Sequence, residues 1–257
     1  NGKGAFLRFK PMDKLKEELI GRVKEGFNLI QFLDENFLNI PLEKLEEFCA
    51  WYKENIHLPM IIQARAESIT EEKIKLLHEI GVHIEMSCGV ETGSKKILND
   101  ICNRFTSKEQ TIKAFGLMKK YGIYPRAYVM IGFPNETRKD VFETVDLIRT
   151  INPYLSIMST FYPFVGVPLR QYCIDNGFIS GKEEAKTFTE ETILKNQPMS
   201  PQEIFNIRRV YNLYVTLPRK YFSDIEDCEK NFDETKFKRL VDLSWKVRDN
   251  WPNYELD

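Results

Sequence analysis

The sequence predicts an α/β fold, a barrel or partial barrel of parallel strands followed by a helical extension. Two observations carry this prediction. Five short apolar runs are typical of buried strands, and segments with helical periodicity separate them in a regular rhythm as far as about Gly177. Strands joined by helices of this length are connected by right-handed crossovers, so the sheet is expected to be parallel. A doubly wound open sheet is the alternative arrangement.

The first part of the chain contains two expected strands. Apolar side chains recur at helical spacing in residues 13–24, and the apolar run 28–33 is expected to form the first strand. Pro41 is typical of a first helical turn, and the apolar side chains after it, as far as Tyr52, define a buried helix face. Residues 60–66 are expected to form the second strand.

The third strand is expected at residues 82–86, after a helix that Thr70 caps and Gly81 ends. Two helices then follow, at residues 93–101 and 107–120.

Two more strands complete the regular rhythm. Residues 123–131 are expected to form the fourth strand and residues 155–161 the fifth, with a helix capped by Thr137 between them. The fifth strand leads into an aromatic, proline-stiffened loop, residues 161–168, which either walls an apolar pocket or fills the core.

After the fifth strand the rhythm changes to helices. Residues 201–215 are expected to form one helix, which the segment LPRKYF ends, and residues 237–251 another. We therefore predict two parts, a partial barrel in residues 1–179 and a C-terminal helical extension in residues 180–257.

Composition indicates a globular protein of a reducing compartment. The chain has 257 residues, of which 42% are hydrophobic and 29% charged, enough to build a sizeable core. The net charge of −1 and the lack of a long basic run argue against general nucleic-acid binding. No apolar run approaches the roughly 20 residues of a membrane span, and no secretory signal is evident, so a cytoplasmic location is expected.

The five cysteines are widely scattered, and no two lie within four residues of each other. This distribution is typical of free thiols and lacks the close spacing of a zinc or iron–sulfur site.

Charged residues lie at or just after the ends of the first two expected strands. In barrels of parallel strands the chemistry lies where strands run into the following loops. Asp34 and Glu35 could accept hydrogen bonds from an ammonium or a ribose, and an ordinary solvated turn is the alternative. Arg65 needs an anionic partner, either a substrate carboxylate or a carboxylate of this chain such as Glu67 or Glu91.

Glycine-containing loops follow the third and fourth strands. Glu91 lies between Gly89 and Gly93, where the backbone can approach a ligand and a helix N-terminus offers free N–H groups. Gly132 gives the same freedom after the fourth strand, and Pro134 stiffens that loop. A plain turn with a helix cap is the alternative at both places.

Taken together, these segments resemble the radical S-adenosylmethionine (SAM) superfamily. The ordered set GVETGS, ICNRFTSKEQ, YVMIGFPNET and FYPFVGVPL is similar to the later barrel half of that family, and the resemblance spans roughly residues 27–177. The tail, especially NLYVTLPRKYF, resembles the helical region of the cobalamin-binding branch. The fold that this resemblance implies is a partial parallel (β/α) barrel of the radical SAM type.

The resemblance also implies an activity. In this family a [4Fe–4S] cluster binds SAM through its amino and carboxylate groups, and reductive cleavage gives methionine and a 5′-deoxyadenosyl radical that abstracts a substrate hydrogen. The cofactors carry this chemistry, and the protein binds, orients and shields them. For the cobalamin branch a cobalamin-dependent methyltransferase is expected. A small-molecule substrate and an electron-donor protein are the implied partners.

Four of the carried-over positions concern the cluster-facing end of SAM. Asp34 and Glu35 match the acidic strand-end segment near the cofactor. Glu91 matches a polar position that faces SAM, and Arg65 is expected to contact the SAM carboxylate or to pair with Glu91.

The remaining positions concern the adenine and the barrel mouth. Ile131, Gly132 and Pro134 match the loop beside the adenine, and Arg104 stands where the family often has lysine. The loop of residues 163–166 matches the segment that closes the mouth.

The sequence departs from the family in one respect. The three cluster-binding cysteines, spaced C-x3-C-x2-C, are absent, and they are expected just upstream of Lys3. Either the chain begins after that motif, which the non-Met start favours, or the protein has lost the cluster. By itself the chain is expected to be inactive, because thiolates hold such clusters.

Two alternatives remain. One is a non-catalytic barrel that binds a nucleoside-like ligand or a protein partner. The other is an unrelated barrel enzyme such as an aldolase, which would need a catalytic lysine at a strand end, and none is evident.

Overall fold

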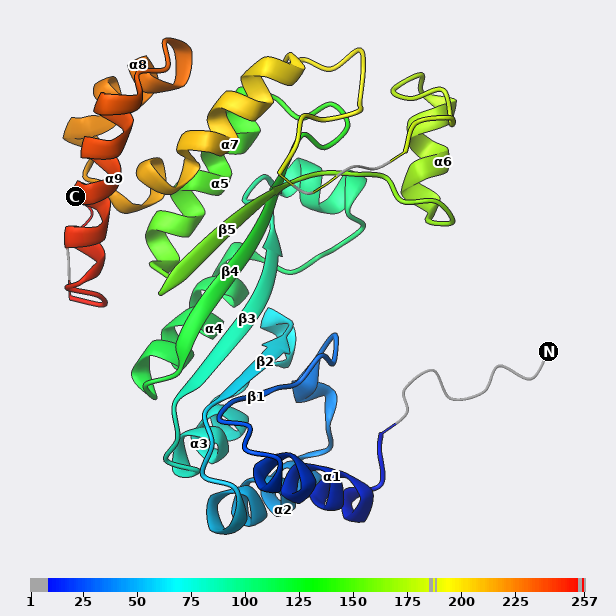
Figure 1. The fold of residues 1–257 in the computed structure, drawn as a ribbon. Coiled ribbons are helices and arrows are strands. Elements are labelled where there is room, and N and C mark those ends of the chain that lie inside the picture. The colour runs from blue at the N-terminus through cyan, green and yellow to red at the C-terminus, as the bar shows by residue number, and fades with distance from the viewer. Residues whose placement is uncertain (1–8, 185–186, 188, 254–255, 257) are drawn as a thin grey trace. The chain divides into compact units, whose positions relative to one another are not determined.

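Five strands lie side by side in chain order in a computed structural model that describes residues 9–184, 187, 189–253 and 256 (Figure 1). The strands are β1 (Ile30–Gln31), β2 (Met60–Ala64), β3 (Ile84–Glu91), β4 (Tyr124–Ile131) and β5 (Leu155–Thr160). β1 pairs parallel with β2, β2 with β3, and β4 with β5. This order and direction confirm the predicted fold class, a partial parallel (β/α) barrel. Lys3, next to which cluster ligands were expected, lies outside the described residues.

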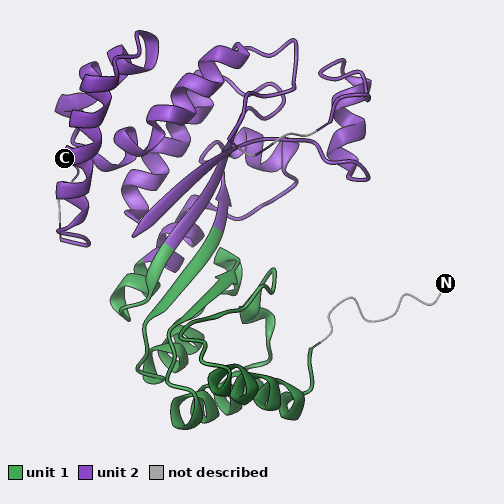
Figure 2. Ribbon diagram, viewed as in Figure 1, with its two compact units in different colours: residues 1–88, 116–125 green, residues 89–115, 126–257 purple. Residues whose placement is uncertain are grey.

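The chain divides into two compact units (Figure 2). Unit 1 comprises the described residues up to Cys88 together with residues 116–125, and unit 2 comprises residues 89–115 and the described residues from Arg126 onward. The predicted boundary between residues 179 and 180 is a different division and stays a prediction.

Unit 1 contains the first helices of the alternating pattern. They are α1 (Met12–Lys24), the short helix η1 (Phe37–Asn39), α2 (Leu42–Asn55), η2 (Ala66–Ser68) and α3 (Glu71–Glu79). Its core includes an aromatic chain in which the Phe48 ring lies 5.8 Å from Phe32 and 5.4 Å from Tyr52. The predicted ends of α3 are confirmed, because the Thr70 hydroxyl accepts a bond from the Lys73 amide and Gly81 has φ +79°.

β1 and β3 differ most in length from the prediction. β1 has only two residues, although Phe32 continues the ladder by donating to the Ile61 carbonyl at 2.9 Å. β3 runs five residues past the expected end at Met86, because Ser87 and Cys88 pair with Gln63 and Ala64 of β2 and are buried. The small and polar residues after Met86 are typical of a turn, but pairing in the parallel sheet keeps Ser87 and Cys88 extended.

Unit 2 contains most of the later helices. They are the π-helix η3 (Ile97–Ile101), α5 (Arg138–Ile151), α6 (Pro168–Asp175), α7 (Pro201–Thr216), η4 (Arg219–Tyr221), α8 (Phe222–Lys230) and α9 (Glu234–Arg248), while α4 (Lys108–Lys120) is divided between the units. The predicted break after α7 is confirmed, but α8 follows it where no helix was expected. Over the described ranges, no helix has both the length and the apolar character needed to span a bilayer.

The C-terminal helices pack on α5. Arg138 of α5 donates to both carboxylate oxygens of the buried Glu229, at 2.5 and 3.0 Å, and the Tyr214 hydroxyl donates to the same carboxylate at 2.9 Å. Arg149, at the other end of α5, donates to the carbonyls of Tyr214 and Leu217 at the end of α7. α5 is therefore fixed to the helices after it at both ends.

Candidate cofactor-binding site

The three predicted site residues of unit 1 line one cavity. This cavity has a volume of about 1090 Å³ and extends along β1 and the loop after it. Asp34, Glu35 and Arg65 contribute to its wall together with aromatic side chains that include Phe32 and Phe37. The cavity thus combines two carboxylates and a guanidinium with apolar surface.

Asn36 links the two loops that carry these charges. Its side-chain oxygen accepts bonds from the Arg65 amide at 3.3 Å and from the Ser68 hydroxyl at 2.8 Å. The segment after β1 is therefore held against the segment after β2, which explains how Asp34 and Arg65 come to line the same cavity.

In unit 2, Glu91 forms an ion pair with Arg104. Arg104 Nη1 lies 2.6 Å from Glu91 Oε1. The side chain of Arg104 is only 19% exposed and that of Glu91 only 23%. Glu91 has φ +63°, a left-handed conformation that is strained for a residue with a side chain and is common at functional sites. Pairing of Arg65 with Glu67 or Glu91 stays a prediction.

The loop after β4 is held by a carboxylate that the sequence did not single out. Glu136 is buried, and its Oε2 accepts bonds from the Gly132 amide at 2.6 Å and the Phe133 amide at 3.3 Å. Gly132 has φ +87°, which explains the glycine. Burial raises the pKa of Glu136 to about 8, and the two amides only partly oppose this effect.

The predicted adenine-loop residues are buried in the same loop. Ile131 ends β4, and its carbonyl accepts a bond from the Phe161 amide at 2.8 Å. Ile131, Gly132 and Pro134 are all buried. The hydrogen-bonding groups of Ile131 and Gly132 named here are therefore already engaged within the protein.

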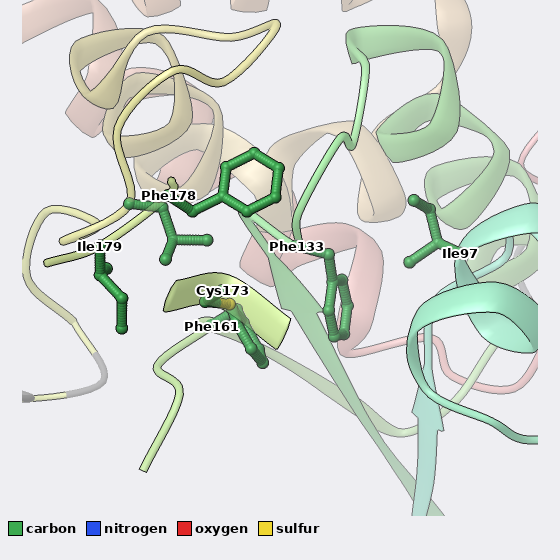
Figure 3. Close-up of a cluster of buried hydrophobic side chains, with 7 residues drawn as sticks. Ile97, Phe133, Phe161, Cys173, Phe178 and Ile179 are labelled. Atoms are coloured by element: carbon green, nitrogen blue, oxygen red, sulfur yellow. The ribbon is translucent and has the colours of Figure 1, made fainter. Parts of the chain in front are cut away.

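A hydrophobic cluster supports this loop (Figure 3). Phe133 packs on Phe161, with ring centroids 5.1 Å apart, and Ile97 of η3 belongs to the same cluster. Its other buried members are Cys173, Phe178, Ile179 and Leu194. Apolar packing thus joins the loop after β4 to the helix that follows β3.

The loop after β5 fills the core with part of its residues, and its role as the wall of an apolar pocket stays a prediction. Phe161 and Tyr162 are buried in the core, whereas Phe164 is 48% and Val165 83% exposed. Arg170 of α6 fixes the loop by donating to the Pro163 carbonyl at 2.9 Å.

Hydroxyl and carboxylate groups connect the loop after β3 to α5. Asp140 Oδ1 accepts a bond from the Ser94 hydroxyl at 2.7 Å, and Oδ2 accepts from the Thr137 hydroxyl at 2.6 Å. Thr144 Oγ1 accepts from the Gly93 amide at 2.8 Å and lies 3.0 Å from Thr92 Oγ1.

Asp140 is ionised within this network. Burial raises its pKa, but the bonds from Thr137 and Ser94 outweigh burial and hold the pKa below its usual value. Sequence reasoning missed Asp140 and Thr144. The only available signal was the spacing Thr137-x-x-Asp140, which forms a capping box.

The charges of unit 2 fit the amino-acid portion of SAM. That portion is a zwitterion, which needs a cation for its carboxylate and an anion for its ammonium. Arg104 and Glu91 offer one of each, side by side and partly exposed.

The described residues do not fit a [4Fe–4S] cluster. Such a cluster needs several thiolates at one place. None of the five cysteines forms a disulfide, and nowhere in the described part of the chain do three or more Cys, His, Asp or Glu side chains gather as a metal site. Burial also raises the pKa of the Cys49 and Cys102 thiols to about 12, so both are protonated at neutral pH. We assign these residues no part in holding iron.

Comparison with known proteins identifies the family. Residues 3–148, more than half of the chain, match the model of the radical SAM superfamily. The chain belongs to the radical SAM superfamily.

Relatives and solved structures extend this result. The chain is 25% identical over 224 residues to an uncharacterized methyltransferase of Pyrococcus horikoshii, a match that covers 86% of this chain and 48% of the relative. Its fold is similar to that of OxsB, a cobalamin-dependent SAM radical enzyme solved with aqua-cobalamin (TM-score 0.60, 16% identity, 92% of this chain and 41% of that chain). It is also similar to TsrM of Kitasatospora setae, a radical SAM methyltransferase solved with cobalamin and a [4Fe–4S] cluster (TM-score 0.57, 17% identity, 65% and 32%). The chain spans less than half the length of each of these proteins.

Proposed function

We propose that this chain is the SAM-binding core of a radical SAM enzyme, in the branch that uses cobalamin for methyl transfer. The observation that carries the proposal is the Glu91–Arg104 ion pair at the end of β3. In such an enzyme the [4Fe–4S] cluster supplies the electron that cleaves SAM, and the proposal gives the described residues the binding of SAM only.

Arg104 and Glu91 are proposed to bind the two charges of the SAM amino acid. The guanidinium of Arg104 matches the SAM carboxylate, and the carboxylate of Glu91 matches the SAM ammonium. The two side chains satisfy each other in this structure, and a zwitterion can replace that contact without leaving a charge unpaired. The left-handed backbone of Glu91 supports the proposal, because strain of this kind collects at binding sites.

The other predicted residues take different parts. Asp34, Glu35 and Arg65 are proposed as cofactor-binding residues of the cavity in unit 1, which two carboxylates and a guanidinium line. Ile131, Gly132 and Pro134 are proposed to shape the adenine site. They would act through packing, because the Gly132 amide and the Ile131 carbonyl are bonded to Glu136 and Phe161.

The cobalamin and methyl-transfer part of the proposal is supported by similarity to other proteins and not by a described contact. It draws on the description of the Pyrococcus horikoshii relative as a methyltransferase and on the two cobalamin-containing structures of similar fold. A small-molecule substrate and an electron-donor protein follow as proposed partners.

Calorimetric titration with SAM tests the binding function. The purified chain is titrated before and after reconstitution with iron and sulfide, alongside Arg104→Gln and Glu91→Gln. Each substitution is expected to weaken SAM binding about tenfold or more, since a charge-assisted hydrogen bond contributes about 1.5–3 kcal/mol.

The matched control is Arg239→Gln, which breaks a surface contact with Asp224 at 3.7 Å in the C-terminal helices. It should bind SAM as the wild type does. Equal binding by all four proteins would reject the assigned site. Because the described residues are assigned no part in holding iron, reconstitution of this chain should leave its SAM affinity unchanged.

A further inference from the structure

Two loops that bear predicted site residues meet on one helix of unit 2. The loop after β3 follows Glu91 and contains Thr92, Gly93 and Ser94, and the loop after β4 runs from Gly132 into α5. Both loops bond to side chains in the first two turns of α5.

Asp140 binds both loops with a single carboxylate. One oxygen accepts from the Ser94 hydroxyl at 2.7 Å, while the other accepts from the Thr137 amide at 2.9 Å and the Thr137 hydroxyl at 2.6 Å. Asp140 is only 8% exposed, so little water competes for these bonds. The same residue therefore caps α5 and fixes the loop after β3.

Thr144 makes the second attachment, one turn further along α5. Its Oγ1 accepts from the Gly93 amide at 2.8 Å, lies 3.0 Å from Thr92 Oγ1, and donates to the Asp140 carbonyl at 3.3 Å. With the Thr92 hydroxyl as donor to Thr144, every one of these bonds has one donor and one acceptor. Thr92 and Thr144 are each 1% exposed, so the bonds lie in the protein interior.

Gly93 lets the loop lie directly on the helix backbone. A Cβ atom at this position would lie 2.3 Å from the Glu143 carbonyl oxygen and 2.7 Å from the Thr144 Cα. Both atoms belong to the backbone of α5 and cannot move aside cheaply. The loop after β3 is therefore held by close packing as well as by hydrogen bonds.

We infer that Asp140 and Thr144 are positioning residues for SAM binding, which set Glu91 in place relative to the loop after β4. Neither residue is assigned a contact with SAM. The inference rests on the proposed function, since it concerns the same site. Loss of the Thr144 hydroxyl leaves the Gly93 amide buried without that acceptor, so the loop shifts and Glu91 moves with it.

The test compares SAM affinity with thermal stability in a set of variants of the full chain. Thr144→Val removes the hydroxyl while keeping the shape, Thr144→Ser restores the hydroxyl, and Ser94→Ala removes only the bond to Asp140. The matched control is Ser156→Ala, which removes another buried hydroxyl of unit 2, bonded to Tyr211 at 2.6 Å. Calorimetry gives the SAM dissociation constant, and thermal unfolding gives Tm.

We expect Thr144→Val and Ser94→Ala to bind SAM about tenfold more weakly, Thr144→Ser to recover binding to within about threefold of the wild type, and Ser156→Ala to lower Tm without changing affinity. Affinity equal to the wild type in Thr144→Val and Ser94→Ala would overturn the inference. So would an equal loss of affinity in Ser156→Ala, since that would reflect stability alone. Should Thr144→Val fail to fold, Ser94→Ala and Thr144→Ser decide the question. A wild-type chain that does not bind SAM would overturn the proposed function itself, and the inference with it.

Discussion

Arg104 Nη1 donates both to Glu91 Oε1, at 2.6 Å, and to the Gly89 carbonyl, at 3.1 Å. One nitrogen therefore holds a carboxylate and the backbone of the strand from which that carboxylate comes. The side chain of Glu91 folds back over Gly89, whose missing Cβ leaves the room for it. This relationship makes Gly89 as important to the candidate site as the two charged residues.

Gly89→Ala should weaken SAM binding while leaving the fold intact. The new Cβ would lie 2.6 Å from Glu91 Oε1, and the flexible carboxylate can swing away from it. We expect SAM affinity to fall about tenfold, with a change in unfolding free energy of no more than about 1 kcal/mol. Calorimetry and chemical denaturation measure the two quantities, and a variant that loses stability but retains affinity would contradict this account.

Gly132→Ala should destabilise the protein by about 1–2 kcal/mol, because alanine is strained at φ +87°. The available space is not the limitation, since the nearest atom to a Cβ would be Ile204 Cγ2 at 3.4 Å. Gly116→Ala is the matched control. It lies in the helix α4 with nothing within 4 Å of a Cβ, so it should raise stability by about 0.5–1 kcal/mol. Effects of the same sign in both variants would be inconsistent with the left-handed backbone of Gly132.

Glu136→Gln should flatten the dependence of stability on pH. The pKa of Glu136 is about 8 in the folded chain against an ordinary value of 4.5, so the folded state binds an extra proton between these pH values. The contribution of Glu136 to the unfolding free energy of the wild type should therefore be largest below about pH 4.5. It should fall as pH rises to 8, by up to about 1.4 kcal/mol per pH unit. Glutamine is neutral throughout and lacks this loss. Urea denaturation of both proteins from pH 5 to 9 checks the prediction, and parallel profiles would refute it.

Arg138→Met should cost about 3–5 kcal/mol of stability, because it leaves the Glu229 carboxylate, 3% exposed, without its guanidinium. A double variant with Glu229→Met should recover most of that loss, since it removes the buried charge as well. Lys238→Met, which breaks an exposed pair with Glu234, should change stability by less than about 1 kcal/mol. Equal effects of Arg138→Met and Lys238→Met would show that burial of Glu229 does not matter.

Periodicity and capping chemistry made much of the fold predictable. The strand–helix alternation follows from apolar spacing, and Thr70 and Thr137 both cap the helices expected of them. The extension of β3 past Met86 was not predictable, because at Ser87 and Cys88 it depends on pairing with β2 and not on local residue preference.

The site was predictable only in part. Glu91 lies in a recognisable motif, but its partner Arg104 is 13 residues away and reaches it only after the chain passes through a π-helix and a left-handed Asn103. No periodicity signals such a return. Asp140 and Thr144 were equally hidden, since a residue on a helix does not reveal which loop lies against it.

α5 has two occupied sides. On one side, Asp140 and Thr144 bind the loops after β3 and β4. On the other side, Arg138, Phe142 and Arg149 contact the helices that follow residue 200. A shortened protein that stops at residue 180 would retain the loops after β3 and β4 but would lack the helices that contact the other side of α5. The C-terminal helices carry none of the predicted ligand contacts, but they support the helix on which the site depends. A shortened protein made for expression or domain exchange should therefore include them.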